Sequence, residues 1–448
     1  MELFVLWMLV VFYLATNIVY AVDLYITYKK ENGLTMAFYC KAMYLLVEAI
    51  VPLIIIGAYT IEGKTYTELA KVDFSMEGLV GLLYYWILTV IGYIALNLGI
   101  RANFRFTYGG KTLKPRQTMT YPASLIITSY ISLAIGIVSF YLWARAYGGI
   151  VAFIKVANAV RGGWNNVVNP LAYFKHPAGL CMVASYAFFT FFCSGRKKLW
   201  IMIPLLISVV FSVMYLLAAD GRLFAAFYFF TLVVIFIRTR AVGQKRISKK
   251  RLILVGCVVI AMAIFMVKMD DITAFVRTGV WPKGDNSGSM FDSLINEFVF
   301  ILSSGQYTVM NSDQIGIQFF NDLGYGLFAW LPTALKPAGF SSNWKINTEL
   351  LGFLRNGTIP FDIITQGFYD LRLVGVFLFP FCFGRVIRLI DEKCSYTPYG
   401  TIVFSALVYI MTRAIPYGEM YDFALGMFSL AVFCVIYWFV KLFFIKNQ

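Results

Sequence analysis

The sequence AADGRLFAA, residues 218–226, joins two apolar segments through a very short charged link. Residues 199–217 precede the link and residues 223–237 follow it, and both segments are apolar. Because the link is too short to leave the membrane surface, Arg222 is expected at a membrane edge. Arg222 also begins a helix, where the positive end of the macrodipole disfavours a cation by about 0.3–1 kcal/mol. We therefore expect an anion beside it, either Asp220 or a bound ligand.

The composition of the whole chain identifies the class of protein. Of its 448 residues, 60% are hydrophobic, 18% are aromatic and only 14% are charged. Apolar runs of about eighteen residues or more recur along the chain, which excludes a soluble fold and indicates a polytopic membrane protein. The net charge of +15 comes from basic residues gathered between these runs, so we interpret it as a topology signal. No nucleic-acid partner is expected.

The apolar runs predict an all-α protein with about eleven transmembrane helices. We place these helices at residues 3–25, 36–60, 78–100, 121–146, 177–195, 199–219, 222–237, 252–268, 368–388, 398–416 and 421–442. All the strongly basic connectors fall on one side, which the positive-inside rule assigns to the cytoplasm. This topology puts the N-terminus outside and the C-terminus inside.

Two long connectors face outward in this topology, residues 147–176 and 269–365. The second lies between spans eight and nine, and connectors of such length are usually functional or disordered. Its tryptophans, its many phenylalanines and the apolar run 298–302 favour helices packed at the membrane interface. We therefore divide the chain into spans one to eight with the first outer loop (1–268), the large outer loop (269–365) and spans nine to eleven (366–448).

Metal and disulfide chemistry find no support in the sequence. The seven cysteines lie in or beside the predicted spans, so no disulfide framework or paired-cysteine metal motif is available. His176 is the single histidine, which excludes multi-histidine metal sites. No metal and no cofactor are expected.

Cationic side chains gather on the predicted outer side. The loop 147–176 contains Lys155, Arg161 and Lys175 but no Asp or Glu, which opposes the positive-inside bias. Guanidinium groups pair bidentately with phosphate oxygens, so a lipid-linked phosphate or diphosphate is the ligand that this side favours. The alternative for each arginine is snorkelling to lipid headgroups. The candidate binding residues are Arg145, Arg161, Arg222, Arg277, Arg355 and Arg413.

Short motifs accompany this layout. GRLFA (221–225) opens a mid-chain helix, and after the large loop PFDIITQGFYD (360–370) leads into LVGV (373–376) and Gly384. In this pattern the chain resembles the O-antigen polymerase (Wzy) group, the oligosaccharide repeat-unit polymerases, over nearly its whole length. A glutamate that the group commonly places before its aromatic-glycine segment is Gln366 here. Asp362 is the candidate to take its place.

The resemblance implies a GT-C-type glycosyltransferase of the bacterial cytoplasmic (inner) membrane. Such an enzyme transfers a growing glycan from undecaprenyl diphosphate onto a sugar hydroxyl of another lipid-linked unit. The product is a surface polysaccharide of the lipopolysaccharide O-antigen or capsule type, and a membrane protein that regulates chain length is a further partner. Arginines, Arg222 foremost, would stabilise the leaving diphosphate. Asp362 or His176 would activate the acceptor hydroxyl.

His176 has two interpretations. It lies at the outer start of span five between Lys175 and Pro177, and the lysine favours the neutral imidazole that a general base needs. The alternative is an ordinary amphipathic side chain at the membrane interface.

Other functions remain open at this point. An O-antigen ligase uses a histidine in its large loop, and residues 269–365 contain none. A flippase or exporter of lipid-linked glycans would have short loops and charges deep in its spans. A membrane O-acyltransferase would have its histidine in a span or on the cytoplasmic side. A structural or sensing membrane protein leaves the acid-free cationic loop unexplained.

Overall fold

The computed structural model describes residues 1–30, 34–66, 71–102, 122–161, 169–195, 198–219, 221–241, 268, 275, 290–332, 335–337, 339–352 and 359–446. These residues form helices and connecting turns, with no strand among them. The helices are α1 (Glu2–Lys30), α2 (Met36–Leu45), η1 (Leu46–Ile50), α3 (Val51–Glu62), α4 (Met76–Arg101), α5 (Ala123–Arg145), α6 (Ile150–Arg161), η2 (Ala172–Phe174), α7 (Lys175–Ala178), α8 (Leu180–Cys193), α9 (Leu199–Ala219), α10 (Arg222–Ala241), α12 (Met290–Asn296), α13 (Val299–Met310), α14 (Asn321–Leu327), α15 (Asn343–Leu350), α16 (Ile363–Lys393), α17 (Pro398–Arg413) and α18 (Met420–Lys446).

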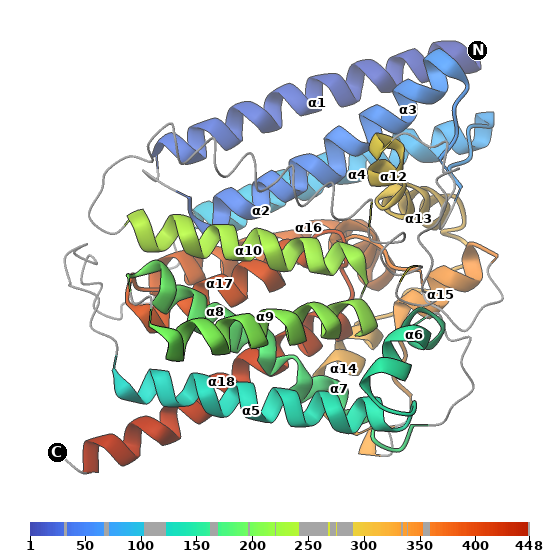
Figure 1. Cartoon of the computed structure of the whole chain (residues 1–448). Helices are drawn as coiled ribbons and strands as arrows, with labels where there is room; N and C mark the ends of the chain where they lie inside the picture. The colour runs from blue at the N-terminus through green and yellow to red at the C-terminus, as the bar shows by residue number, and fades with distance from the viewer. Residues whose placement is uncertain are drawn as a thin grey trace. The chain divides into compact units, whose positions relative to one another are not determined.

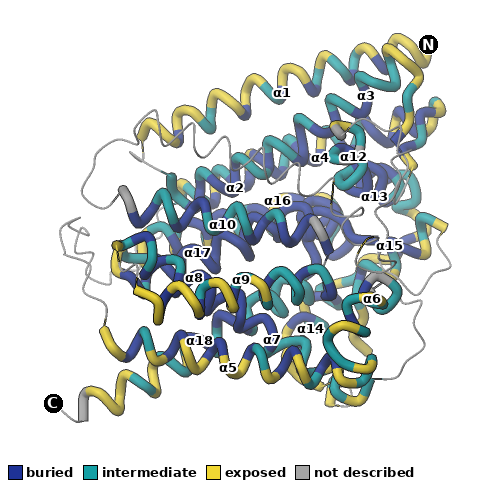
Figure 2. Tube along the Cα trace, viewed as in Figure 1, coloured by how far each residue is buried: buried dark blue, intermediate teal, exposed yellow. Residues whose placement is uncertain are grey.

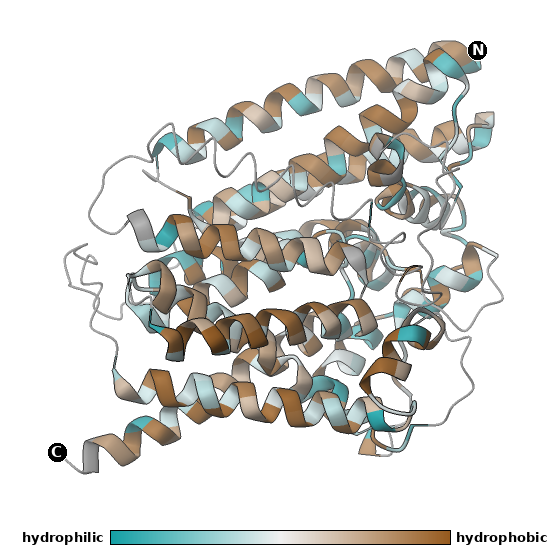
Figure 3. Cartoon of the chain, in the orientation of Figure 1, coloured by the Kyte–Doolittle hydropathy of each residue, from teal (hydrophilic) through white to brown (hydrophobic). Residues whose placement is uncertain are grey.

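Eight helical segments in the described part of the chain are long and apolar enough to cross a membrane, which confirms an all-α polytopic membrane protein. They are Glu2–Lys30, Met36–Glu62, Met76–Arg101, Ala123–Arg145, Ala172–Cys193, Leu199–Ala219, Ile363–Lys393 and Met420–Phe444. Figure 3 shows apolar residues along most of α9, the segment that precedes the short charged link.

Three further predicted spans are not among these eight. Span 222–237 corresponds to the shorter apolar stretch Leu223–Thr239 of α10, and span 398–416 corresponds to the 16-residue α17. Span 252–268 lies outside the described residues, apart from Lys268.

The chain divides into two compact units. The first comprises residues 1–109, 288–393 and 411–424, and the second comprises residues 110–287, 394–410 and 425–448. The helices α17 and α18 each contribute one end to each unit.

In the first unit, α1 packs along α2 and α3 (Figure 1). Only 28% of its most apolar window is buried, and Figure 2 shows its exposed residues along much of its length. On the face of α1 that packs against the other helices, Asp23 forms an ion pair with Lys41 of α2 at 2.7 Å. Asp23 also accepts a hydrogen bond from the hydroxyl of Tyr93 in α4 at 2.7 Å. Intramembrane charges are costly unless they are paired, so this contact fixes α1 against α2 and α4.

Helix α16 is broken near its start. Leu371 (φ −141°, ψ 21°) and Arg372 (φ 54°, ψ −138°) are not helical and separate the half-helix 363–370 from the longer helix 373–393. A Cβ built on Gly375 would lie 1.8 Å from the carbonyl oxygen of Gly367. In a continuous helix, residues eight apart are separated by about 12 Å along the axis. The chain therefore folds back at the break, and only glycine lets the two backbones approach so closely.

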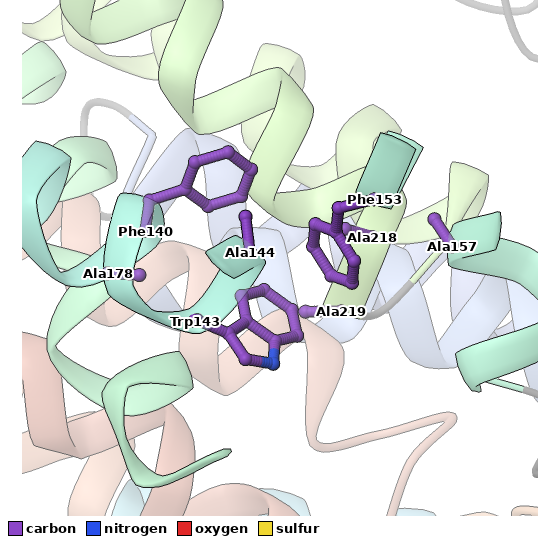
Figure 4. Close-up of a cluster of buried hydrophobic side chains, with 8 residues drawn as sticks. All are labelled: Phe140, Trp143, Ala144, Phe153, Ala157, Ala178, Ala218 and Ala219. Atoms are coloured by element: carbon purple, nitrogen blue, oxygen red, sulfur yellow. The ribbon is translucent and has the colours of Figure 1, made fainter. Parts of the chain in front are cut away.

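The second unit has its own apolar core, shown in Figure 4. Phe140 and Trp143 of α5 pack with Phe153 of α6 and with Ala218 and Ala219 at the end of α9. The ring centroids of Trp143 and Phe153 are 4.6 Å apart in an edge-to-face arrangement. This core holds the end of α9 directly before the short charged link.

Candidate functional site

Three buried carboxyl groups meet in the first unit, and we call Asp322, Asp370 and Glu419 the acid cluster. Asp322 lies in the first turn of α14, Asp370 ends the half-helix 363–370, and Glu419 precedes α18. The backbone N–H groups of Gln318 and Phe319 donate to the carbonyl oxygens of Tyr369 and Asp370 at 3.1 and 3.2 Å. These bonds attach residues 318 and 319 to the half-helix, so elements far apart in sequence place the three acids together.

Asp322 is completely buried and has a partner for each carboxylate oxygen. Its Oδ2 accepts from the backbone N–H of Met420 at 2.7 Å, and its Oδ1 accepts from the backbone N–H of Asn343 at 3.5 Å. Its carboxyl group also hydrogen bonds to that of Glu419. Glu419 accepts a hydrogen bond from the Ser342 hydroxyl. Two carboxyl groups bonded to each other must share a proton.

The two acids of this pair differ in their affinity for that proton. Burial raises the pKa of Asp322 to about 7, and the neighbouring charge of Asp370 acts in the same direction against the bonds from Met420 and Asn343. Burial and the charge of Asp322 raise the pKa of Glu419 well above its usual range. Near neutral pH, Glu419 therefore holds its proton while Asp322 can take one up or release it.

Side-chain amides connect Asp370 to the same site. Gln366 donates its Nε2–H to Asp370 Oδ2 at 2.8 Å, and Asn343 donates its Nδ2–H to Asp370 Oδ1 at 3.4 Å. The resembled group commonly has a glutamate where this chain has Gln366. Here the amide is one helical turn before Asp370 and holds that carboxylate in place.

Aromatic rings and one cation lie beside the acid cluster. The rings of Tyr325 and Tyr421 stack with centroids 4.4 Å apart, and Lys336 Nζ lies 4.8 and 4.4 Å from them. Lys336 Nζ also donates to the Tyr421 hydroxyl at 3.1 Å, and burial lowers the pKa of this lysine. Trp330 donates its Nε1–H to the carbonyl oxygen of Ala424 at 2.7 Å, yet 42% of the residue is exposed. Carboxyl groups, amides and aromatic faces are groups that bind hydroxyl-rich ligands.

The predicted site residue Asp362 lies in the first unit, but in a different place from the acid cluster. It is fully buried at the start of the half-helix, and its carboxyl group hydrogen bonds to that of Glu48. Its own segment pairs with the end of α17 and the turn that follows. The backbone N–H of Ile363 donates to Ile415 O at 3.0 Å, and that of Gly418 donates to Phe361 O at 2.7 Å.

Arg413 ends α17 close to this pairing. Its Nη2 lies 2.6 Å from Asp422 Oδ2 and 3.1 Å from the Asp422 carbonyl oxygen, and only 5% of the residue is exposed. The guanidinium charge is therefore already compensated by Asp422. Arg355, the third predicted residue of this unit, lies outside the described residues.

The other predicted residues belong to the second unit. Arg222 begins α10 and Arg161 ends α6, but their side chains are outside the described part, as are Asp220 and Arg277. Arg145 is exposed in the last turn of α5. His176 is half-buried in α7, with its ring 5.3 Å from that of Tyr173 and 5.9 Å from that of Phe428. A phosphate site that joins these residues stays a prediction.

Sequence reasoning missed Asp322, Glu419 and Glu48. Asp322 is the only carboxylate between Asp313 and Glu349, and Glu48 is the only acid in the predicted span 36–60. A lone acid in an apolar segment was the signal that could have identified both. Glu419 lies in a connector of ordinary composition and gave no such signal.

In the described residues, no group of three or more His, Cys, Asp and Glu side chains is placed to hold a metal ion. Comparison of the chain with protein-family models, curated proteins and solved structures finds no match.

Proposed function

We propose that this protein is a membrane glycosyltransferase that polymerises oligosaccharide repeat units carried on undecaprenyl diphosphate. The observation that carries the proposal is the hydrogen-bonded pair of Asp322 and Glu419, with the pKa of Asp322 raised to about 7. A general base works best when its pKa is near the operating pH. The resemblance to the O-antigen polymerase group supplies the class of substrate.

In this mechanism Asp322 activates the acceptor. Its ionised carboxylate takes the proton of an acceptor sugar hydroxyl as that oxygen bonds to the anomeric carbon of the donor. The bond from that carbon to the diphosphate oxygen breaks, and undecaprenyl diphosphate leaves with the bonding electrons. Glu419 remains protonated and holds Asp322 in position.

Cations stabilise the charge that develops on the diphosphate. Lys336 is the cation beside the acid cluster, and stacking against Tyr325 and Tyr421 holds it there. Arg222 remains the foremost of the predicted diphosphate contacts, with Arg145, Arg161, Arg277 and Arg355 as companions. Arg413 is the weakest candidate, because its charge is paired with Asp422.

The proposal includes the finer topology. About eleven spans, an external N-terminus and a cytoplasmic C-terminus place the large loop 269–365 on the outer face of the inner membrane. The acid cluster then lies on the side where the lipid-linked donor is presented. Cysteine labelling can test this: a cysteine at Gly243 that reacts with an impermeant reagent added outside intact cells overturns the topology.

The test of the function is the glycan ladder on a gel. A strain that lacks this protein should attach single repeat units to its surface carrier, and Asp322→Asn should reproduce that pattern at normal protein level. Asp313→Asn is the matched control, because Asp313 is an exposed acid of the same loop. A full ladder from Asp322→Asn overturns the role of Asp322.

One observation favours a second candidate, a flippase or exporter of lipid-linked glycans. The buried carboxyl groups of Glu48 and Asp362 meet at a broken helix, and broken helices with intramembrane acids are common in transporters. The same gel separates the two functions. Loss of transport leaves no glycan on the surface carrier, whereas loss of polymerisation leaves one repeat unit.

A further inference from the structure

Two carboxyl groups meet inside the membrane-spanning part of the first unit. Glu48 lies in the π-helical turn Leu46–Ile50, near the middle of the 27-residue span Met36–Glu62, and it is completely buried. Single π-helical turns inside longer helices occur frequently at functional sites. An intramembrane acid is costly and is therefore a candidate functional group by default.

Asp362 reaches the same depth because α16 is broken. A Cβ built on Gly92 would lie 2.1 Å from Ile364 Cδ1, and the ring of Tyr84 packs edge-on against that of Phe368. The start of the half-helix is therefore level with Gly92, well inside the 26-residue α4. The half-helix runs from this depth toward the Met76 end of α4 and carries Asp362 at its inner end.

The hydrogen bonds around the pair indicate which of the two carboxyl groups carries the proton. Asp362 Oδ2 and Oδ1 accept from the backbone N–H groups of Ile364 and Thr365, each at 3.1 Å. Glu48 Oε2 accepts from the Tyr85 hydroxyl at 3.0 Å, whereas Glu48 Oε1 accepts from no donor among the described residues. The two carboxyl groups nevertheless hydrogen bond to each other. Because both oxygens of Asp362 already accept backbone hydrogen bonds, Asp362 is the ionised acceptor and Glu48 carries the proton.

The other groups that face the pair are neutral hydroxyls. They are Tyr13 and Tyr20 of α1, Tyr44 of α2 and Tyr85 of α4. The hydroxyls of Tyr13 and Tyr20 are buried and have no hydrogen-bond partner in the described part of the chain. Tyr13 interacts electrostatically with both Glu48 and Asp362. No cation is among the groups that interact with Glu48 there, so only a bound cation can offset a second negative charge.

We propose that Glu48 and Asp362 form a proton-binding site inside the membrane, with the exchangeable proton on Glu48. Loss of this proton leaves two adjacent carboxylates without a counter-charge, and their repulsion acts on the inner end of the half-helix. The outer end of the half-helix is Asp370, which belongs to the acid cluster. Occupancy of the proton site therefore sets the position of Asp370, whichever reaction the protein performs.

Infrared spectroscopy of the purified full-length chain in lipid nanodiscs can test the site without any substrate. With ¹³C-labelled glutamate, the carbonyl band of protonated glutamic acid should be present at neutral pH. Glu48→Gln should remove part of that band, and the remainder belongs to Glu419. The matched control is Glu62→Gln, an exposed glutamate at the end of the same span, which should leave the spectrum unchanged. A band that is the same in wild type and in Glu48→Gln overturns the proposal.

A second variant covers the case in which Glu48→Gln does not fold. Tyr85→Phe removes the hydrogen bond to Glu48 Oε2, which stabilises the ionised form more than the neutral form. The Glu48 band should therefore persist to higher pH in Tyr85→Phe than in wild type. If the band instead disappears on replacing potassium by sodium at constant pH, the pair binds sodium and the proton assignment is wrong. Both outcomes are independent of the glycan ladder, so this site and the proposed function can fail separately.

Discussion

Asp322 Oδ2 accepts a hydrogen bond from the backbone N–H of Met420, the first residue of α18, at 2.7 Å. The acceptor lies in the first turn of α14, and the donor begins a helix that is long and apolar enough to cross a membrane. The first backbone N–H groups of a helix have no partner within it, so a carboxylate there satisfies one of them and complements the helix dipole. The candidate base is therefore fixed to the membrane domain by its own hydrogen bond.

The pH dependence of polymerisation follows from the raised pKa of Asp322. A general base must be ionised, so the rate should rise with pH through about 7 and then level off. Repeat-unit transfer by the purified protein, measured with lipid-linked substrate over pH 5–9, checks this. A rate that is flat over this range removes Asp322 from the role of base.

Stability should change with pH in the opposite direction. The pKa of Asp322 is about 7 in the folded chain against an ordinary value of 3.8, so the folded state binds more protons between these values. The free energy of unfolding should fall as pH rises through this window and become constant above it. Thermal unfolding in detergent measures the effect. The slope should be smaller in Asp322→Asn, which cannot titrate.

The turn between the two parts of α16 should tolerate no side chain at its glycines. Gly375→Ala puts a methyl group against the carbonyl of Gly367, and overpacking of this kind costs about 1–3 kcal/mol. Unfolding temperature and membrane level should both fall. The control is Gly57→Ala in α3, where the added Cβ meets nothing within 4 Å and alanine is about 1 kcal/mol better in a helix. Equal stability of the two variants would show that the halves of α16 do not pack as described.

Two lysine pairs of the first unit should differ sharply in their contribution to stability. Lys41 is 3% exposed beside Asp23, and Lys41→Ala should destabilise the protein by about 3–5 kcal/mol because a buried charge loses its main partner. Lys64 is 38% exposed beside Asp292, and Lys64→Ala should cost much less, because a solvated ion pair contributes little to stability. Chemical unfolding of the two variants in the same detergent gives the comparison, and similar losses would contradict the buried pair.

The clearest prediction about recognition of the lipid-linked glycan donor concerns Arg222. Arg222→Lys keeps the charge but loses the planar fork, so both Arg222→Lys and Arg222→Ala should reduce the ladder to single repeats. Loss of one preorganised donor costs about a hundredfold to a thousandfold in rate. Immunoblotting of membranes must show normal protein level. Arg388→Ala, at a half-exposed pair with Glu392, is the control and should retain the ladder. A full ladder from Arg222→Ala leaves Arg222 as an interfacial anchor.

The spans were predictable because about twenty consecutive apolar residues have few alternatives to a transmembrane helix. The predicted span 78–100 agrees with Met76–Arg101 to within two residues at each end. The break in α16 was not predicted, although the charged Asp370 and Arg372 interrupt the apolar run on either side of Leu371. The predicted span 368–388 accordingly begins inside the half-helix, before the break.

The acid cluster could not be predicted from the sequence, for a different reason. Asp322 and Met420 are 98 residues apart, and only the folded loop brings them into contact. Asp362 was identified as a candidate from its motif, but its partner Glu48 was not. Spacing along one chain segment says nothing about a partner on another helix.

The half-helix 363–370 also fixes the spacing between Asp362 and Asp370. Asp370 lies eight positions after Asp362, which is about 12 Å of helix and slightly more than two turns. An insertion of one residue after Gly367 would rotate Asp370 by about 100° around the axis while Asp362 stayed in place. The distance and the phase between the two acids are therefore set by residue count. Changes of composition within this segment are tolerable only where they preserve its length.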